Sequence, residues 1–244
     1  MARKQPTSQS LCRIATASLR RTARATVLAA ALTWPPARVS AESPAWPDTS
    51  LTRLQALALI QSLNAEILGS RSATLSLEKW CRDHKLAIEP KIVARVIPGA
   101  VRAPAAEQLE RLEVSSAGEV KYRRVQLECG GQVLSVADNW YVPGRLSAET
   151  NLLLETTGTP FGTAVRALKP YRQTLAVKLL WLPLPDGWEL GSSVAPPAPS
   201  TGSLAIPDAL FEHRAVLYTR DHKPFSEVHE VYQRQILAFP PPRP

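Results

Sequence analysis

VKYRRVQLECGGQVLSVADNWYV, residues 120–142, decides the fold of this chain. Two segments of about ten residues alternate apolar with polar side chains, the pattern of a half-buried strand. Gly130-Gly131 lies between them, and glycine reaches positive φ without steric cost, so the pair predicts a hairpin turn. The stretch therefore predicts two antiparallel strands, at 120–129 and 132–142, and Pro143 ends the second.

The flanking sequence supplies helices before this hairpin and after it. Apolar residues recur at three and four positions over 50–68, which predicts an amphipathic helix that Gly69 ends. Further helices are predicted at 75–84 and 147–155, and further strands at 91–97, 174–182, 210–219 and 226–238. Because hairpins dominate and strands do not alternate regularly with helices, we expect an α+β fold, a single antiparallel sheet with helices packed on one face.

The N-terminus has the pattern of a cleavable export signal. Seven basic residues precede Glu42, an apolar run covers 25–34, and Val39-Ser40-Ala41 offers a small-x-small cleavage site. The run is too short for a transmembrane helix. We therefore expect a periplasmic or secreted protein cleaved near Ala41, by a Sec or a Tat route, with a mitochondrial transit peptide as the alternative.

Removing this segment also removes most of the net charge. The whole chain has a formal charge of +8, but the residues from Glu42 onward carry 22 basic and 21 acidic side chains. A body of about +1 lacks the electrostatic footprint of a nucleic-acid-binding protein. No later stretch is long and apolar enough for a membrane span. We expect an export signal at 1–41, followed by the N-terminal helices and the first strand at 42–100. The main sheet is expected at 101–240, with a Pro/Ser-rich loop at about 187–207, and a disordered tail at 241–244.

Metal and nucleotide sites are not indicated by any motif. The four histidines form no His-x-x-x-His pair, and the chain has no CxxC, P-loop, GxGxxG or GxSxG motif. We therefore expect no metal and no cofactor. Cys81 and Cys129 could form one disulfide in an oxidising compartment, but the sequence favours two small buried apolar residues.

Residues 119–163 resemble the central region of chorismate lyase. The shared features are an arginine on a strand (Arg124), a Gly turn, a returning strand that ends in Val142-Pro143, a helix, and a step at Pro160-Phe161-Gly162. Residues 211–237 resemble the closing strands of the same family and of the related effector-binding domains of GntR-type repressors. Ser72-Ala73-Thr74 stands where the family has Ser-Met-Thr, so Ala73 leaves one pocket wall smaller.

The resemblance implies a buried pocket that works without metal or organic cofactor. Chorismate lyase eliminates pyruvate from chorismate and leaves 4-hydroxybenzoate. By motif, Arg124 would clamp a carboxylate with its planar fork, and Glu230 would be the catalytic acid. Phe161, Gly162 and Ala73 would contact the ligand. The partner implied is a small, aromatic carboxylate.

Each of these residues also has a plainer interpretation. Arg124 could be a surface strand residue beside Arg123, Glu230 could be solvated like Glu227, and Phe161 could belong to the core. Asp138 and Asn139 could add a polar contact, although strand-edge positions are favoured for them.

Two hypotheses of function therefore stand. The first is an exported lyase that acts on chorismate, and the second is a periplasmic binding protein that holds a small carboxylate without turnover. An exported lyase would lack its usual cytosolic substrate, which argues for a changed function. An exported domain with an inert fold is a third reading.

Overall fold

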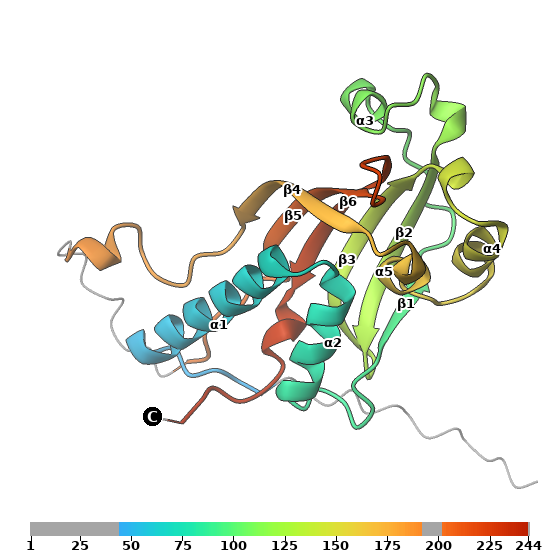
Figure 1. The fold of residues 1–244 in the computed structure, drawn as a ribbon. Coiled ribbons are helices and arrows are strands. Elements are labelled where there is room, and N and C mark those ends of the chain that lie inside the picture. Colours follow the sequence, from blue (N-terminus) through green and yellow to red (C-terminus); the bar gives the residue numbers. More distant parts are fainter. Residues whose placement is uncertain (1–43, 192–201, 244) are drawn as a thin grey trace, which may run out of the picture. The chain divides into compact units, whose positions relative to one another are not determined.

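Six strands form one sheet in the order β1-β2-β3-β6-β5-β4, in a computed structural model that describes residues 44–191 and 202–243 (Figure 1). All neighbouring strands pair antiparallel. The strands, in chain order, are Ile92–Val96, Lys121–Cys129, Gln132–Tyr141, Tyr171–Leu179, Ala209–Tyr218 and Pro224–Gln233. With the helices described below, this arrangement confirms the predicted α+β class.

The central hairpin forms as the two glycines predict. Cys129 pairs with Gln132, and Gly130 and Gly131 between them have φ of +57° and +83°. A side chain at Gly130 would also collide with Ala87, because its Cβ would lie 2.5 Å from the Ala87 Cβ. This turn therefore needs glycine both for its backbone conformation and for the close approach of the 87 loop.

Two strands differ in extent from the prediction. β4 begins at Tyr171, three residues before the predicted start, because its pairing with β5 begins there at Tyr218. β6 ends at Gln233, where the chain turns into a short 3-10 segment, Arg234–Leu237. Two apolar side chains of that segment, Ile236 and Leu237, are buried in the core, which an extended strand would not have allowed.

Two long helices cover one face of the sheet (Figure 1). α1 (Ser50–Gly69) and α2 (Ala73–Asp83) bury apolar side chains against it, and α4 (Ala148–Thr156) and α5 (Phe161–Ala164) continue this layer. α3 (Ala106–Arg111) lies near one end of the sheet, where the adjoining Leu112 packs against Trp140 and Val142. The main core consists of the apolar faces of α1 and α2 with residues that include Val125, Leu127, Leu134, Phe211 and Tyr232.

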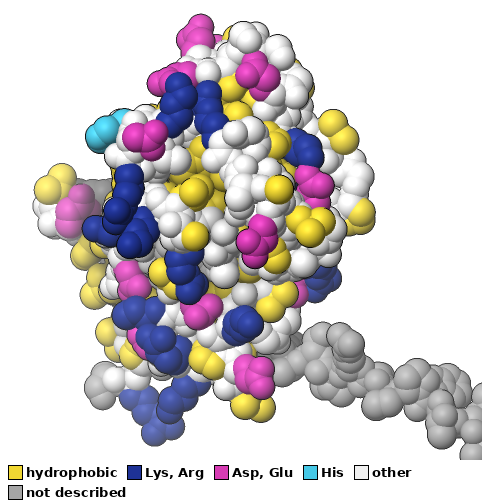
Figure 2. All heavy atoms as spheres, turned by 45° about the vertical axis from the view of Figure 1, so that its right-hand side comes forward, with side chains coloured by type: hydrophobic (Ala, Val, Ile, Leu, Met, Phe, Trp, Pro, Cys, Tyr) yellow, Lys and Arg dark blue, Asp and Glu magenta, His cyan; other side chains and the backbone are white. Residues whose placement is uncertain are grey.

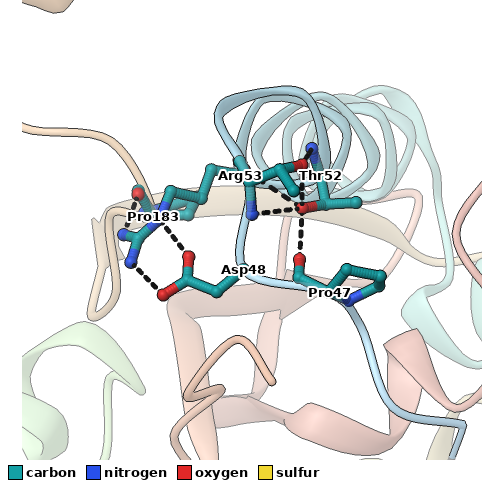
Figure 3. A network of polar contacts seen from close by, with 6 residues as sticks. Pro47, Asp48, Thr52, Arg53 and Pro183 are labelled. Carbon is teal, nitrogen blue, oxygen red and sulfur yellow. Dashed lines mark hydrogen bonds and ion pairs between the residues drawn. The ribbon is translucent and has the colours of Figure 1, made fainter. Parts of the chain in front are cut away.

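α1 begins at a network of polar contacts (Figure 3). Thr49 caps the helix by accepting a hydrogen bond from the Thr52 amide, and the Thr52 hydroxyl donates to the Pro47 carbonyl. Arg53 forms a two-pronged ion pair with Asp48, at 2.6 Å and 3.0 Å, and donates to the Pro183 carbonyl at 2.8 Å. Because Pro183 follows β4, this arginine joins the helix start to the edge of the sheet.

The two cysteines of the body are bonded to each other. Cys81 on α2 and Cys129 at the end of β2 form a disulfide with 6.4 Å between their Cα atoms, a usual separation. The preference for two unpaired cysteines is therefore corrected. The sequence could not supply this pairing, because it depends on how α2 crosses the sheet. The bond ties the helix layer to the strand layer.

The predicted export signal at 1–41 and half of the Pro/Ser-rich loop lie outside the described residues. The tail reaches back to the body, since Gln55 donates to the Pro242 carbonyl at 2.9 Å. One face of the molecule shows acidic and basic side chains interspersed with apolar ones (Figure 2). Among the described residues, no helix has the length and apolar character needed to cross a membrane.

Candidate functional site

A pocket of about 230 Å³ lies on the covered face of the sheet, beside the start of α2 and α5. Strands β2, β3, β4, β5 and β6 supply its floor, and the two helices supply its walls. The apolar part of the lining includes Leu75, Val125, Leu127, Ala137, Phe161, Leu217 and Val228. Such a lining with a few polar groups is typical of a small-molecule site.

An ion pair is buried in this pocket. Nη2 of Arg172 lies 2.8 Å from Oε2 of Glu230, and the side chains are only 5% and 9% exposed. The Tyr232 hydroxyl donates to the same carboxylate oxygen at 3.1 Å. Burial acts to lower the pKa of Arg172, but the charge of Glu230, the nearby Tyr232 and the hydrogen bond to Glu230 together outweigh it and raise the pKa above its ordinary value. The guanidinium is therefore a fixed positive charge in an apolar cavity.

Two polar groups of the pocket lack partners among the described residues. Nε of Arg172 is buried without a hydrogen bond, although Nη2 of the same side chain is paired. Asn139 on β3 is 3% exposed, lines the pocket, and makes no side-chain hydrogen bond with the described part of the chain. Buried polar groups are nearly always paired, so these two indicate space for a polar ligand atom.

A second buried arginine lies next to this site. Arg123 on β2 is the cross-strand partner of Asn139 and is 6% exposed. Its Nη2 donates to the Thr159 carbonyl at 3.1 Å, but Nε and Nη1 are buried without partners. Burial lowers the pKa of this guanidinium, and no carboxylate among the described residues pairs with it. A buried cation without a counter-ion is costly, so an anion nearby would be stabilising.

Three more basic side chains line the pocket, and all three are exposed. They are Arg71, which precedes α2, and Arg166 and Lys169, which follow α5. None of them forms an ion pair with another described residue. Lys169 also adopts the left-handed backbone conformation, with φ of +48°. With Arg172, the lining has four cations and one carboxylate, so the pocket favours an anionic ligand.

Four of the five predicted site residues lie at this pocket. Ala73, Phe161, Gly162 and Glu230 line it, and their contact with a ligand stays a prediction. Gly162 has a structural reason as well. A Cβ there would lie 2.9 Å from the hydroxyl oxygens of both Ser72 and Thr74, so the glycine lets α5 approach the start of α2.

Arg124 does not line the pocket, and its expected placement is corrected. Side chains alternate between the faces of a strand, and Val125 and Leu127 point to the covered face, so Arg124 points to the other. Its side chain is 42% exposed and lies 3.6 Å from Asp138, which also accepts the Tyr122 hydroxyl. The guanidinium inside the pocket is that of Arg172, a residue that precedes the predicted fourth strand.

His229 lies on the other face too. Its Nε2 is 3.1 Å from Glu212, while the adjacent Glu230 faces the pocket, as the alternation of strand side chains predicts. Within the described residues, no group of three or more His, Cys, Asp or Glu side chains could hold a metal ion.

Fold and pocket together define the class: an α+β protein with one antiparallel sheet and a cation-lined cavity beneath its helices. The chain belongs to the same family as the uncharacterized protein y4mC of Sinorhizobium fredii, with 46% identity over 198 residues, 81% of this chain and 83% of that protein. No family model matches the chain.

The solved structures similar to this chain include effector domains of transcriptional regulators. The effector domain of PhnF from Mycobacterium smegmatis has 13% identity and a TM-score of 0.41, over 67% of this chain and 88% of that one. The regulator YydK from Bacillus subtilis has 17% identity and a TM-score of 0.34, over 58% of this chain and 57% of that one. A GntR-family regulator from Enterococcus faecalis has 12% identity and a TM-score of 0.36, over 58% and 93%.

Proposed function

We propose that this protein binds a small organic carboxylate with an apolar body, in the pocket that contains Arg172 and Glu230. The observation that carries the proposal is the unpaired buried Nε of Arg172, a residue that lines a cavity with apolar walls. Nη2 of that guanidinium is held by Glu230, so its orientation is fixed before any ligand arrives. A carboxylate that accepts from Nε would complete the hydrogen bonding of the arginine.

The buried Arg123 supports the same proposal. It adds a second positive charge next to Asn139 on the covered face, and none of the described carboxylates neutralises it. A ligand anion near Asn139 would compensate this charge in a medium of low dielectric constant. The apolar lining, including Phe161 and Val228, would contact the body of the ligand, which favours an aromatic or similarly compact acid.

A lyase is the second candidate, and the position of Glu230 favours it. A carboxylate in an apolar pocket beside a guanidinium is an arrangement that can move a proton at a bound substrate. Under this alternative, Arg172 anchors chorismate or an analogue, and Glu230 assists the loss of pyruvate that leaves 4-hydroxybenzoate. The pairing of Glu230 with Arg172 and Tyr232 favours binding over catalysis, since both partners already occupy the same carboxylate oxygen.

We also propose that the protein is exported. The basic and apolar pattern of residues 1–41 supports this, and so does the Cys81–Cys129 disulfide, because such bonds persist in oxidising compartments.

Titration calorimetry with 4-hydroxybenzoate and with chorismate tests the proposal. Arg172→Gln should weaken carboxylate binding by about 30-fold or more, as expected when one partner of a buried charged hydrogen bond is removed. Arg172→Lys should also bind poorly, because an ammonium cannot make the fork. Arg124→Gln is the matched control and should bind like the parent protein. Equal binding by the Arg172 and Arg124 variants would refute the proposal.

The same samples separate binding from catalysis. Chorismate is added and the absorbance of 4-hydroxybenzoate is followed with time. Product that disappears in Glu230→Gln would establish the lyase. Saturable binding without product, across the pH range in which the protein is folded, would establish the binding protein.

A further inference from the structure

β4 has an outer edge that no described segment covers. It is the last strand of the sheet, and among the described residues it pairs only with β5 (Figure 1). The Leu180 amide, just after β4, donates to the Leu210 carbonyl of β5 at 2.9 Å. Because backbone groups alternate sides along a strand, the amides and carbonyls of Val177 and Leu179 point away from β5, and no described residue bonds to them. The strand therefore offers free donors and acceptors along its outer side.

The opposite edge of the sheet is protected. β1 has only five residues, and its Ala94 amide donates outward to the Gly158 carbonyl at 2.9 Å. β4 has nine residues, no proline, and two exposed apolar side chains, Leu175 at 42% and Val177 at 38%. A long apolar edge of this kind pairs readily with another extended chain. The difference between the two edges indicates that β4 is open to a partner strand.

Unpaired cations lie beside this edge. Lys178 on β4 and Arg214 on β5 are exposed, and neither forms an ion pair with another described residue. Arg214 is opposite Ala176 in the strand register, so the two cations lie close together on the uncovered face of the sheet. Glu212 is opposite Lys178, but its carboxylate contacts His229 at 3.1 Å. The edge therefore has a positive charge that an acidic chain would neutralise.

A second copy of this chain fits the edge less well than an acidic partner does. Residues 156–185 contain four basic side chains and no acidic one. Two β4 edges that paired with each other would bring these like charges together, which is destabilising between neighbouring strands. An acidic chain would gain from the same cations and from the same backbone hydrogen bonds.

We infer that β4 is a docking edge, at which an acidic, extended segment of a partner protein adds a seventh strand to the six of the sheet. Backbone hydrogen bonds to Val177 and Leu179 hold this segment. Its side chains alternate, so that apolar ones lie beside Val177 on the helix-covered face and acidic ones lie beside Lys178 and Arg214 on the other face. Residues 175–179 do not line the pocket, so the inference does not depend on the proposed function.

Heptapeptides test the edge by fluorescence anisotropy on the full chain. The probe is fluorescein-labelled EVEVEVE, and its controls are KVKVKVK, of opposite charge, and EVEPEVE, whose proline interrupts backbone pairing. We expect EVEVEVE to bind at least about ten-fold tighter than either control, with an affinity that falls as salt is added. Equal binding of EVEVEVE and KVKVKVK would overturn the inference, and so would the absence of EVEVEVE binding up to about 1 mM peptide.

Variants locate the peptide on β4. Val177→Pro removes an outward donor but none of the bonds to β5, and an edge strand tolerates proline at such a position. Lys178→Glu combined with Arg214→Glu reverses both charges. We expect each of these variants to weaken EVEVEVE binding by about ten-fold or more. Lys91→Glu, which changes an exposed cation just before β1, is the matched control and should bind like the parent.

The same variants test the other interpretations of the edge. If the double charge variant binds EVEVEVE as tightly as the parent, the peptide lies elsewhere and the inference is refuted. That variant decides the question alone if urea unfolding shows that Val177→Pro does not fold. Analytical ultracentrifugation should find the parent monomeric in the absence of peptide. A parent dimer that Val177→Pro or the double charge variant dissociates would assign the edge to a second copy and refute the acidic partner.

Discussion

Arg172 of β4 and Glu230 of β6 are joined by an ion pair of 2.8 Å, although β5 lies between their strands. The register places Leu217 of β5 opposite Arg172 and His213 of β5 opposite Glu230, so the guanidinium reaches the carboxylate diagonally beneath the helix layer. The pair thus places two opposite charges inside one apolar cavity, where each depends on the other for compensation.

The first prediction concerns the stability of this pair. Arg172→Gln alone should lower the free energy of unfolding by about 3–5 kcal/mol, because it leaves Glu230 buried without its partner. The double variant Arg172→Gln with Glu230→Gln should recover most of that loss. Urea denaturation of the parent, the two single variants and the double variant gives the coupling energy. Additive effects of the two single substitutions would contradict the prediction.

His213 predicts how stability depends on pH. This fully buried side chain on β5 lies 2.7 Å from the Asn64 side-chain oxygen, so neutral His213 donates from Nε2. Burial lowers its pKa to about 4, from an ordinary value of 6.5. Above pH 6.5 both folded and unfolded chains hold a neutral imidazole. Between pH 6.5 and 4 only the unfolded chain takes up the proton. The free energy of unfolding therefore decreases as the pH is lowered, by about 3 kcal/mol over this range.

Unfolding measured in urea at several pH values between 7 and 4 tests this dependence. His213→Gln keeps a donor for Asn64 but cannot take up the proton, so its stability should change less over this range. Burial also lowers the pKa of His84, which makes His84→Gln the matched comparison. A pH slope that is the same in His213→Gln as in the parent would show that His213 does not titrate as described.

The disulfide gives the third prediction. Cys81 and Cys129 are 48 residues apart, and closing a loop of that length in the unfolded chain is worth about 4 kcal/mol. Replacing both cysteines with alanine, or reducing the bond, should lower the free energy of unfolding by about that amount. Unfolding curves with and without reductant measure the loss. The double alanine variant should give the same curve with and without reductant. Thiol alkylation without reductant should label neither cysteine in the intact protein.

Much of the fold could be predicted from local sequence. Gly130-Gly131 located the central hairpin, and the apolar spacing located α1. The beginning of β4 could not be predicted, because Tyr171 and Arg172 become strand residues through their pairing with β5. Arg172 could therefore not be predicted as a site residue, since no motif in the sequence around it indicates a pocket.

The wrong face predicted for Arg124 has a different cause. The resemblance to chorismate lyase predicted a site arginine at position 124, but Arg123 and Arg124 are adjacent, and a shift of one residue reverses the face. The alternation of buried residues along the strand determines the face. Val125, Leu127 and Cys129 are buried, and Arg123 lies on the same face as these residues. The partner of Cys81 and the approach of α5 to α2, in contrast, depend on contacts between distant segments that no local pattern encodes.

The last prediction separates the stability of the protein from its ligand binding at Arg123. The guanidinium is buried with two unpaired nitrogens and no described carboxylate partner. In the ligand-free protein, the free-energy cost of removing this charge from water is therefore not compensated. Arg123→Met, which keeps the length and apolar volume of the side chain, should therefore raise the free energy of unfolding of the ligand-free protein by about 1–4 kcal/mol. The same variant should bind carboxylates more weakly, and saturating ligand should stabilise it less than it stabilises the parent.

Thermal unfolding with and without 4-hydroxybenzoate measures both effects, and Arg124→Met on the opposite face should show neither. A destabilised Arg123→Met with unchanged affinity would mean that the two carbonyl contacts of Arg123, at Thr157 and Thr159, are its whole role.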